Sequence, residues 1–350
     1  MIYYVVTREA RGTIHLFLAG DGKALAPHTR VILYEELFRM RRVPTGTWIF
    51  SDLERLDRED LERAARCWAA LEATDPAMKL FNHPLRVKRR YELLRALEIA
   101  GINDYAVHRI DEGRVPERFP VFLRVENDHK GPGTDLLHTA EELAHAIAAL
   151  EADGKSRDHR LITEYCAEAD SEGRFRKYGA FLLDGEILPR HLLVNKHWVA
   201  KGRDREACNE TIPEQIEYNE KNPHAEELLR AFEIAGIDYG RVDYTIVGGR
   251  IQIYEINTNP QITVPGWGGG DPRRTRIKIE FAESFVERVL PWADTGKKAS
   301  VPVRFETGSA LQRRGFAAAD AIRRIANAVG LGRFEPVIFT RMKKAFRRFR

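Results

Sequence analysis

Residues 242–247 and 251–257 are two short runs in which apolar and polar residues alternate, and a pair of glycines lies between them. This pattern predicts a β-hairpin, because side chains along a strand point to opposite faces in turn. Glu255 and Asn257, two residues apart on the second strand, must point to the same face. The chain therefore has to place an acid and an amide on one side of an antiparallel sheet, and the register of the hairpin decides whether Asp243 joins them.

The register of this hairpin depends on the length of its loop. A three-residue loop, 248–250, pairs Val247 with Ile251 and places the two carboxylates opposite each other. A two-residue loop would instead pair Asp243 with Tyr254 and separate the carboxylates. We predict the longer loop, because it gives an apolar face on which Gln252 is the one polar residue among Val242, Tyr244, Ile246, Tyr254 and Ile256.

Two carboxylates and an amide oxygen are hard oxygen donors, which suit Mg²⁺ or Mn²⁺ that also binds phosphate oxygens. A zinc site would usually include thiolate or imidazole ligands. The alternative is an ordinary hairpin with a solvated acidic face. Asn259-Pro260 favours the metal site, because the proline ends the ladder where ligands would lie.

The arrangement D…E-I-N-T-N-P, formed by Asp243 and residues 255–260, resembles the metal-binding signature of ATP-grasp enzymes. It is most similar to the carboxylate–amine ligase branch, which includes D-alanine–D-alanine ligase and glutathione synthetase. Residues 119–124 resemble the family's P-x-V-x-K strand, residues 131–134 fall where a glycine-containing loop closes over the phosphates, and residues 162–166 resemble the linker whose backbone meets the adenine edge. The resemblance covers residues 80 to 292.

The resemblance implies an α/β (α+β) fold in which two α+β subdomains grip ATP. It also implies that Asp243, Glu255 and Asn257 hold the metal. Arg124 stands where the family has a lysine that binds phosphates, so a planar fork replaces a point charge. Lys130 is a plausible replacement for that lysine.

A second expected lysine, at the start of a helix, corresponds loosely to Lys88, Arg89 or Arg90, and we choose Arg90. The nucleotide would be bound by Arg90, Arg124, Glu164, Tyr165, Cys166, Lys177, and Glu168 or Asp170 at the ribose. Cations that would act on the phosphates or the reacting intermediate are Arg124, Lys130, Arg176 and Arg190. Surface ion pairs are the alternative for Arg176 and Arg190.

The basic residues are concentrated at the end of the chain. The whole sequence has a net charge of +4, but residues 313–350 hold eleven Lys and Arg residues against Asp320 and Glu335. Phenylalanines recur there at helical spacing, which predicts a basic amphipathic helix. It could pack on its own protein or on a subunit partner in a homo-oligomer, or bind an anionic membrane or nucleic acid.

The sequence predicts a small α/β domain over 1–80, an ATP-grasp N-subdomain over 81–165, a C-subdomain with the metal site over 166–295, and a basic helical extension over 296–350. No apolar run approaches the roughly 20 residues that span a bilayer. The three cysteines are odd in number and lack C-x-x-C spacing, so we do not expect a disulfide framework. We therefore expect a cytoplasmic protein.

The resemblance implies an ATP- and Mg²⁺-dependent ligase that converts a carboxylate to an acyl phosphate, which an amine then attacks. Such chemistry depends on positioning and charge neutralisation, which fits a sequence without a recognisable nucleophile and base pair. One alternative is a phosphotransferase that uses the same nucleotide site. Another is a non-catalytic nucleotide-binding module that docks through its basic tail. The substrates are small-molecule or peptide carboxylates and amines, whose identity the sequence does not give.

Overall fold

The computed structural model describes residues 1–128, 131–199, 209–263, 271–293 and 299–305. It divides the chain into a compact unit from Met1 to Val303 and a second unit from Arg304 to Arg350. Lys130 and the basic segment 313–350 lie outside the described residues. No helix in the described ranges is long and apolar enough to cross a membrane.

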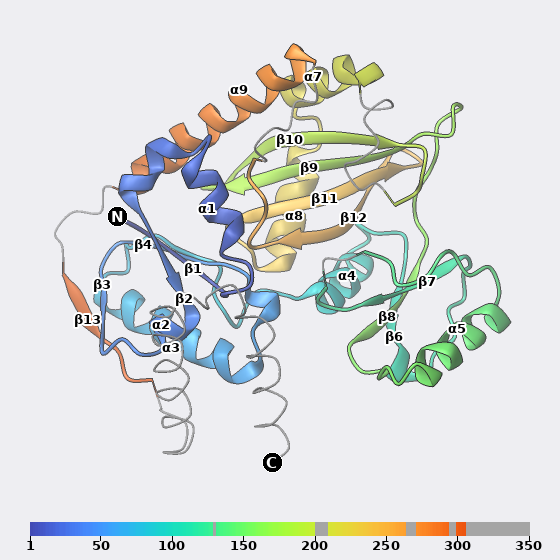
Figure 1. The fold of residues 1–350 in the computed structure, drawn as a ribbon, viewed down its shortest axis with the longest axis horizontal. Helices are drawn as coiled ribbons and strands as arrows, with labels where there is room; N and C mark the ends of the chain where they lie inside the picture. The colour runs from blue at the N-terminus through green and yellow to red at the C-terminus, as the bar shows by residue number, and fades with distance from the viewer. Residues whose placement is uncertain (129–130, 200–208, 264–270, 294–298, 306–350) are drawn as a thin grey trace, which may run out of the picture. The chain divides into compact units, whose positions relative to one another are not determined.

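The N-terminal part of the chain forms a parallel sheet with strand order β2-β1-β4-β5 (Figure 1). Its strands are β1 (Ile2–Val6), β2 (Thr29–Leu33), β4 (Thr47–Phe50) and β5 (Leu80–Phe81). The connections contain α1 (Gly12–Ala19), η1 (Lys23–His28), α2 (Tyr34–Leu37), β3 (Arg42–Pro44), η2 (Leu53–Arg55) and α3 (Arg58–Thr74). Every residue of the inner strand β1 is buried, as expected for a parallel sheet that is covered on both faces. This part of the chain is the α/β unit that the sequence predicts.

The next part is a three-stranded antiparallel sheet with order β6-β8-β7. It contains α4 (Arg90–Ile99), β6 (Val107–Arg109), η3 (Ile110–Glu112), β7 (Val121–Val125), α5 (Ala140–Ala152) and β8 (Arg160–Glu164). Val121 and Leu123 pack in a small core with Leu143 of α5. Because side chains alternate along a strand, Phe122 and Arg124 of β7 point to the other face. That face lines the cavity described below.

A four-stranded antiparallel sheet with order β10-β9-β11-β12 follows. Its elements are β9 (Phe175–Leu183), β10 (Glu186–Asn195), α7 (Ile212–Lys221), α8 (Ala225–Ala235), β11 (Gly240–Val247), β12 (Arg250–Asn257), α9 (Pro272–Val289) and η4 (Leu290–Ala293). Phe232 of α8, Tyr218 of α7 and Leu94 of α4 join Val242 and Tyr244 in one core on one face of this sheet. The opposite face is left for Asp243 and its neighbours.

The β11–β12 hairpin has a two-residue loop, so the predicted three-residue loop is wrong. Val247 pairs with Arg250, and the loop consists of Gly248 and Gly249 alone. Both glycines have positive φ angles, 55° and 79°. Two-residue hairpin loops of this kind require positive φ at both positions, which glycine adopts without strain.

A β-bulge compensates for the shorter loop. Tyr244 pairs with Ile253, whereas Asp243 pairs with Glu255, so Tyr254 is an extra residue on β12. The insertion shifts the register by one residue between the loop and the carboxylates. The predicted pairing of Asp243 with Glu255 is therefore confirmed, although the loop that was expected to produce it is absent.

The bulge also changes which β12 side chains enter the core. Ile251 and Ile253 pack with the core face and are 6% and 0% exposed. Gln252, predicted as a polar residue on that face, instead pairs with Thr245 on the opposite face. It accepts a hydrogen bond from the Asp104 backbone (2.8 Å) and donates to the Asp104 carboxylate (2.7 Å).

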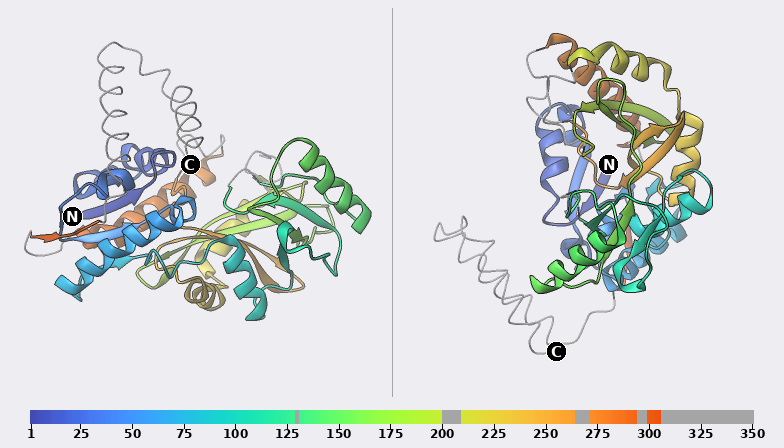
Figure 2. Two further views of the ribbon diagram at one scale, coloured as in Figure 1. Left: turned by 90° about the horizontal axis from the view of Figure 1, so that it is seen from below. Right: turned by 90° about the vertical axis from the view of Figure 1, so that its right-hand side faces the viewer.

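The end of the described chain returns to the N-terminal sheet. Helix α9 packs through Phe281 and Phe285 against a core that includes Phe17 of α1, and the orange α9 lies beside the blue N-terminal elements in Figures 1 and 2. Strand β13 (Ser300–Pro302) then pairs with β3. These residues lie in the range predicted to be a helical extension, and that part of the prediction is wrong because they add a strand to β3.

Candidate active site

The two hairpin carboxylates lie side by side on β11 and β12, as predicted. Asp243 is almost fully buried, at 1% exposure, and Asn257 is 7% exposed. The Asn257 amide donates a hydrogen bond to Glu255 at 3.3 Å. The structure therefore brings together the three side chains that the sequence predicts as metal ligands.

Lys177 and Arg241 hold the Asp243 carboxylate. The Lys177 ammonium donates to Oδ2 at 2.9 Å, and Arg241 donates to both oxygens at 2.8 and 3.2 Å. Burial by itself would raise the pKa of Asp243, but the charges of Arg241 and Lys177 outweigh it and hold the pKa below its usual value. Asp243 is thus a buried carboxylate that stays ionised.

Glu255 is paired with two arginines from the neighbouring subdomain. Arg90, at the start of α4, donates to Glu255 Oε2, and the Arg124 guanidinium lies 3.9 Å from the same oxygen. Burial opposes ionisation of Glu255, but Arg90 and Arg124 lower its pKa overall. Burial and the nearby Arg90 charge in turn lower the pKa of Arg124 to about 10.

These groups border a cavity of roughly 190 Å³ between the two antiparallel sheets. Arg124, Lys177, Asp243 and Glu255 line one part of it, and the linker residues 164–167 line another. Several aromatic residues also line it, and three of their rings lie together: Trp198 is 5.1 Å from Phe122 and 5.8 Å from Tyr165 between ring centroids. The cavity wall therefore combines charged side chains with aromatic rings.

Two buried polar atoms of the cavity have no hydrogen-bond partner among the described residues: Arg124 Nε and Thr163 Oγ1. Such orphaned groups are uncommon in folded proteins and cost free energy. Thr163 pairs with Phe122 across β8 and β7, so both side chains share the cavity face. A polar ligand in the cavity would satisfy both atoms.

The linker residues predicted to meet a nucleotide lie at the cavity, but the Glu164 carboxylate is already used. It accepts hydrogen bonds from the Ala106 backbone at 2.9 Å and from Arg118 at 2.7 and 3.1 Å. The Cys166 carbonyl accepts from the Tyr254 hydroxyl at 3.0 Å. Tyr165 and Cys166 therefore offer ring and backbone surfaces, while Glu164 fixes the start of the linker.

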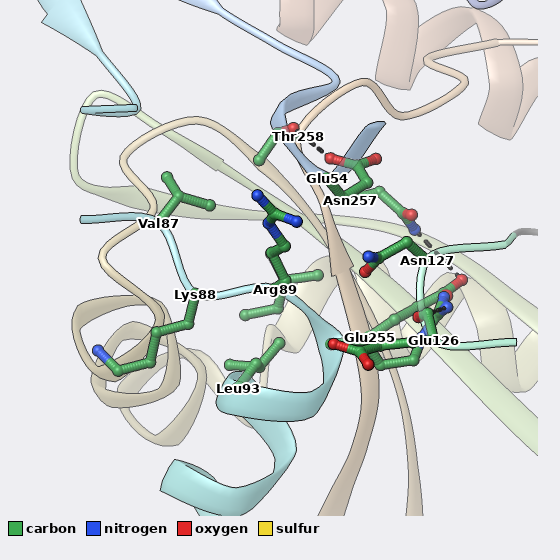
Figure 3. A pocket seen from close by; sticks show the side chains of 12 residues that line it. Glu54, Val87, Lys88, Arg89, Leu93, Glu126, Asn127, Glu255, Asn257 and Thr258 are labelled. Carbon is green, nitrogen blue, oxygen red and sulfur yellow. Dashed lines mark hydrogen bonds and ion pairs between the residues drawn. The ribbon is translucent and has the colours of Figure 1, made fainter. Parts of the chain in front are cut away.

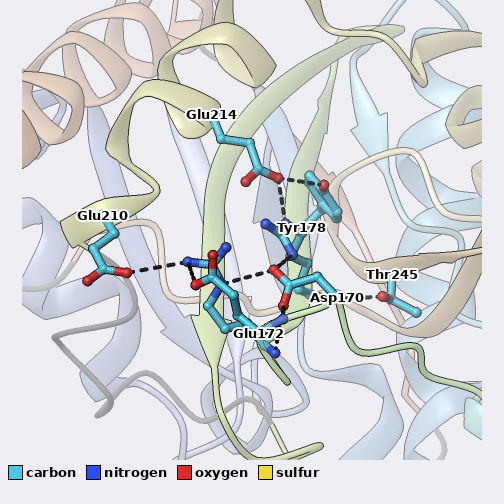
Figure 4. A network of polar contacts seen from close by, with 8 residues as sticks. Asp170, Glu172, Tyr178, Glu210, Glu214 and Thr245 are labelled. Atoms are coloured by element: carbon cyan, nitrogen blue, oxygen red, sulfur yellow. Dashed lines mark hydrogen bonds and ion pairs between the residues drawn. The ribbon is translucent and has the colours of Figure 1, made fainter.

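Asp170 and Arg176 belong to an ion-pair network that includes neither Asp243 nor Glu255 (Figure 4). Arg176 donates to Asp170 at 2.8 Å and to Glu214 of α7 at 2.7 Å. Arg176 and Lys177 are consecutive on β9, so their side chains point to opposite faces of the sheet. Lys177 reaches Asp243 and Arg176 reaches Glu214 of α7, although both residues also line the cavity. The role of Arg176 on the phosphates stays a prediction.

Besides Asp170, two further predicted residues do not border the cavity. Glu168 accepts a hydrogen bond from the Gly248 backbone at 3.0 Å, at the exposed turn of the hairpin. Arg190 is buried, donates to the Ile262 carbonyl at 2.7 Å, and stacks 4.6 Å from the Phe281 ring centroid. Neither Glu168 nor Arg190 borders the cavity.

Arg241, the unpartnered hydroxyl of Thr163 and the anchoring of residues 258–259 were not predicted from the sequence. Arg241 lies two positions before Asp243 on the same strand face, so the period of two could have identified it. Thr258 donates to Glu54 at 2.9 Å, and Asn259 accepts from the Tyr4 hydroxyl at 2.9 Å. The second half of the hairpin motif is thereby fixed to the N-terminal sheet, which no local pattern indicates.

The donor set fits a magnesium ion that is shared with a ligand. Within the described ranges, no group of three or more His, Cys, Asp and Glu side chains could hold a metal. Two carboxylates and one amide supply only part of the six oxygens that Mg²⁺ prefers, which leaves positions for phosphate oxygens. Asp243, Glu255 and Asn257 would hold such an ion only together with a phosphate-bearing ligand.

Comparisons with known proteins give structural likeness alone, because no protein-family model and no curated protein matches the chain. D-alanine–D-alanine ligase from Bacillus anthracis complexed with ATP is 13% identical, with a TM-score of 0.42 over 82% of this chain and 98% of that one. The ATP-grasp ligase PsnB, complexed with minimal precursor, Mg and ADP, is 10% identical, with a TM-score of 0.45 over 84% and 97%.

The macrocyclase MdnC bound with precursor peptide MdnA, from Microcystis aeruginosa, is 11% identical, with a TM-score of 0.41 over 82% of this chain and 99% of that one. The evidence from the chain itself is the order of its motifs, its two antiparallel sheets and the hairpin that carries Asp243 and Glu255. The solved structures add a likeness of fold alone.

Proposed function

We propose that this protein is an ATP- and Mg²⁺-dependent ligase that activates a carboxylate as an acyl phosphate for attack by an amine. The observation that carries the proposal is the cavity in which Arg124 and Lys177 meet Asp243 and Glu255. A strongly cationic wall next to two ionised carboxylates suits a triphosphate whose charge is shared between side chains and a divalent metal.

Each group has a distinct part in this proposal. Asp243, Glu255 and Asn257 hold the metal, which neutralises charge as the phosphoryl group moves. Lys177 and Arg124 line the cavity and pair with the carboxylates, so both cations can bind phosphate oxygens when the carboxylates take the metal. Arg241 keeps Asp243 oriented through its two hydrogen bonds.

The cavity also suits the nucleoside. Trp198, Phe122 and Tyr165 provide aromatic surface for a base, and the Tyr165–Cys166 backbone lies beside them at the same cavity. The orphaned Thr163 hydroxyl provides one more polar contact. Closing such a site around the substrates would exclude water, which otherwise hydrolyses an acyl phosphate.

The test is a phosphate-release screen of the full chain with ATP and Mg²⁺. Amino acids, peptides and hydroxy acids serve as donor and acceptor pairs. We expect ADP, phosphate and an amide only when both substrates are present. A stable phosphorylated acceptor without amide would identify a phosphotransferase instead, and absence of any ATP turnover would refute catalysis.

Two variants connect the activity to the site. Asp243→Asn and Glu255→Gln should each lower the rate of phosphate release at least 100-fold, because each removes a charged metal ligand. Glu186→Gln is the matched control, since this carboxylate lies in the same sheet on β10 and its side chain is 71% exposed. Equal loss in all three variants would show that the effect is not specific to the hairpin.

A further inference from the structure

Asn257, one of the three proposed metal ligands, lies where the hairpin ladder ends. It is the last residue of β12 and pairs with Arg241, and Pro260 follows three residues later. The ends of strands open more readily than their centres unless other contacts hold them. What holds the residues after Asn257 therefore decides how firmly its side chain is placed.

Thr258, the next residue, is fixed to the N-terminal part of the chain. Its hydroxyl donates a hydrogen bond to Glu54 at 2.9 Å and accepts one from the Leu53 backbone at 3.3 Å. Glu54 and Leu53 belong to η2, the turn that follows β4. Thr258 is 1% exposed, and Figure 3 shows its hydroxyl and the Glu54 carboxylate facing each other. One buried hydroxyl thus joins the end of the metal hairpin to the N-terminal sheet.

Asn259 provides a second anchor to the same part of the chain. Its side-chain oxygen accepts from the Tyr4 hydroxyl at 2.9 Å, and its amide donates to the Ala10 carbonyl at 3.2 Å. Tyr4 lies on β1 and is 2% exposed. Thr258 and Asn259 therefore make four hydrogen bonds to residues from β1, from the loop after β1 and from η2.

These anchors lie directly beside the metal ligands. Glu54, Glu255, Asn257 and Thr258 line one small pocket with about 20 Å³ of free space. Consecutive Cα atoms are about 3.8 Å apart, so a shift of Thr258 moves Asn257 almost as far. Mg²⁺ tolerates little displacement, because it requires near-octahedral geometry at about 2.0–2.1 Å. The N-terminal contacts can therefore decide whether Asn257 is in reach of the ion.

We propose that Thr258 and Asn259 are positioning residues, through which the N-terminal sheet holds Asn257 in the geometry that a metal-bound nucleotide requires. The inference rests on the proposed function, because it concerns the same metal site. It gives the N-terminal α/β unit a part in metal binding, although Asp243, Glu255 and Asn257 all lie on β11 and β12. In this role Thr258 and Asn259 act through the backbone of Asn257 rather than as ligands.

The experiment measures ADP binding to the full chain by titration calorimetry, once with Mn²⁺ and once with EDTA. The factor by which Mn²⁺ tightens ADP binding is the metal gain. Thr258→Val keeps the shape of the side chain but loses both hydrogen bonds, so it should lower the metal gain about 10-fold, as the loss of a supporting contact at a metal site does. ADP affinity in EDTA should change less than about twofold, because Phe122, Thr163 and Arg124 line the nucleotide cavity from other strands.

Thr258→Ser restores the hydroxyl and should keep the metal gain within about threefold of wild type. Tyr4→Phe removes only the hydrogen bond to Asn259 and should lower the metal gain about three- to tenfold. It also carries the test if Thr258→Val does not fold. Thr245→Val is the matched control, because Thr245 lies in the same hairpin, is 2% exposed and donates to the Arg176 carbonyl at 2.8 Å. Its metal gain should equal that of wild type.

The proposal is overturned if Thr258→Val and Tyr4→Phe keep the metal gain, if Thr258→Ser does not restore it, or if Thr245→Val loses it equally. Mn²⁺ that fails to tighten ADP binding in wild type overturns the proposal and the metal site together. Loss of the metal gain in Thr258→Val, when wild type releases no phosphate with any substrate pair, would refute the ligase function and leave this inference standing. An unchanged metal gain in Thr258→Val, when wild type forms an amide, would do the reverse.

Discussion

Gly179 is the position at which the structure makes its sharpest energetic prediction. It lies on β9 between Asp243 of β11 and His191 of β10, so the three residues form one row across the sheet. A Cβ atom at Gly179 would lie 2.4 Å from His191 Cε1 and 2.6 Å from Nε2. The imidazole therefore occupies the space that a side chain at position 179 would need.

The magnitude follows from that overlap. Carbon atoms pack at about 3.5–4.0 Å, so in Gly179→Ala the ring must move by roughly 1 Å. His191 is only 5% exposed, and burial together with the Arg241 charge holds its pKa well below the usual value, so the ring is neutral. Overpacking of this kind costs about 1–3 kcal/mol.

The assay is urea denaturation of wild type, Gly179→Ala, His191→Ala and the double variant. Each single variant should be destabilised, the first by overlap and the second by a cavity. In the double variant the new methyl group enters the space that the ring leaves, so its loss should be at least about 1 kcal/mol smaller than the sum of the two. Unchanged stability of Gly179→Ala, or strict additivity, would refute the packing argument.

Three further predictions concern other elements. Thr163→Val should stabilise the ligand-free protein by up to about 1 kcal/mol, because it removes an unpaired hydroxyl. The same variant should weaken MgATP binding about 2- to 10-fold in calorimetry, and tighter binding would contradict a contact between Thr163 and the ligand. Asn82→Ala should lower the free energy of unfolding in urea by about 2–4 kcal/mol. The Asn82 side chain donates to the carbonyls of Phe50 and Tyr239 and accepts from the backbone of Asp238 and Tyr239. A loss below about 1 kcal/mol would contradict the stabilising role of these four hydrogen bonds. Burial and the charge of Glu54 raise the pKa of Asp52 from 3.8 to about 6, although Thr7 and Arg55 oppose the shift. Because Asp52 binds its proton more tightly in the folded state, it stabilises that state fully at pH values below the unfolded pKa. This stabilisation, about 3 kcal/mol, is lost as the pH rises through 6. Asp52→Asn should therefore remove the fall in unfolding free energy between pH 4 and 7.

Local patterns in the sequence predict the strands that carry the site. The strand expected at 119–124 overlaps β7, and the two runs at 242–247 and 251–257 fall in β11 and β12. These elements have strong periodicity or a turn dipeptide, and both are properties of neighbouring residues. The shared face of Glu255 and Asn257 follows from the same local information, whereas the pairing of Asp243 with Glu255 also depends on the bulge at Tyr254.

The partners of single side chains depend on contacts that are distant in sequence. Arg176 and Asp170 are near the linker in sequence, but Glu214, which fixes Arg176, comes from α7. Arg190 is buried against Phe281 of α9, far along the chain. No period in the sequence indicates which cation a distant helix will pair with, so the choice among Lys177, Arg176 and Arg190 required the fold.

The bulge at Tyr254 explains why the carboxylate pairing was predicted correctly from the wrong loop. With Gly248-Gly249 alone, unbroken alternation would pair Asp243 with Tyr254, and burying Ile251 and Ile253 would leave Glu255 one residue out of register. One inserted residue satisfies both the tight glycine turn and the facing acids. The insertion also turns Tyr254 toward the linker, where its hydroxyl donates to Cys166 and its ring lines the cavity. Bulges often re-aim a side chain beside a functional site, and here the same residue sets the register of the carboxylates and forms part of the cavity wall.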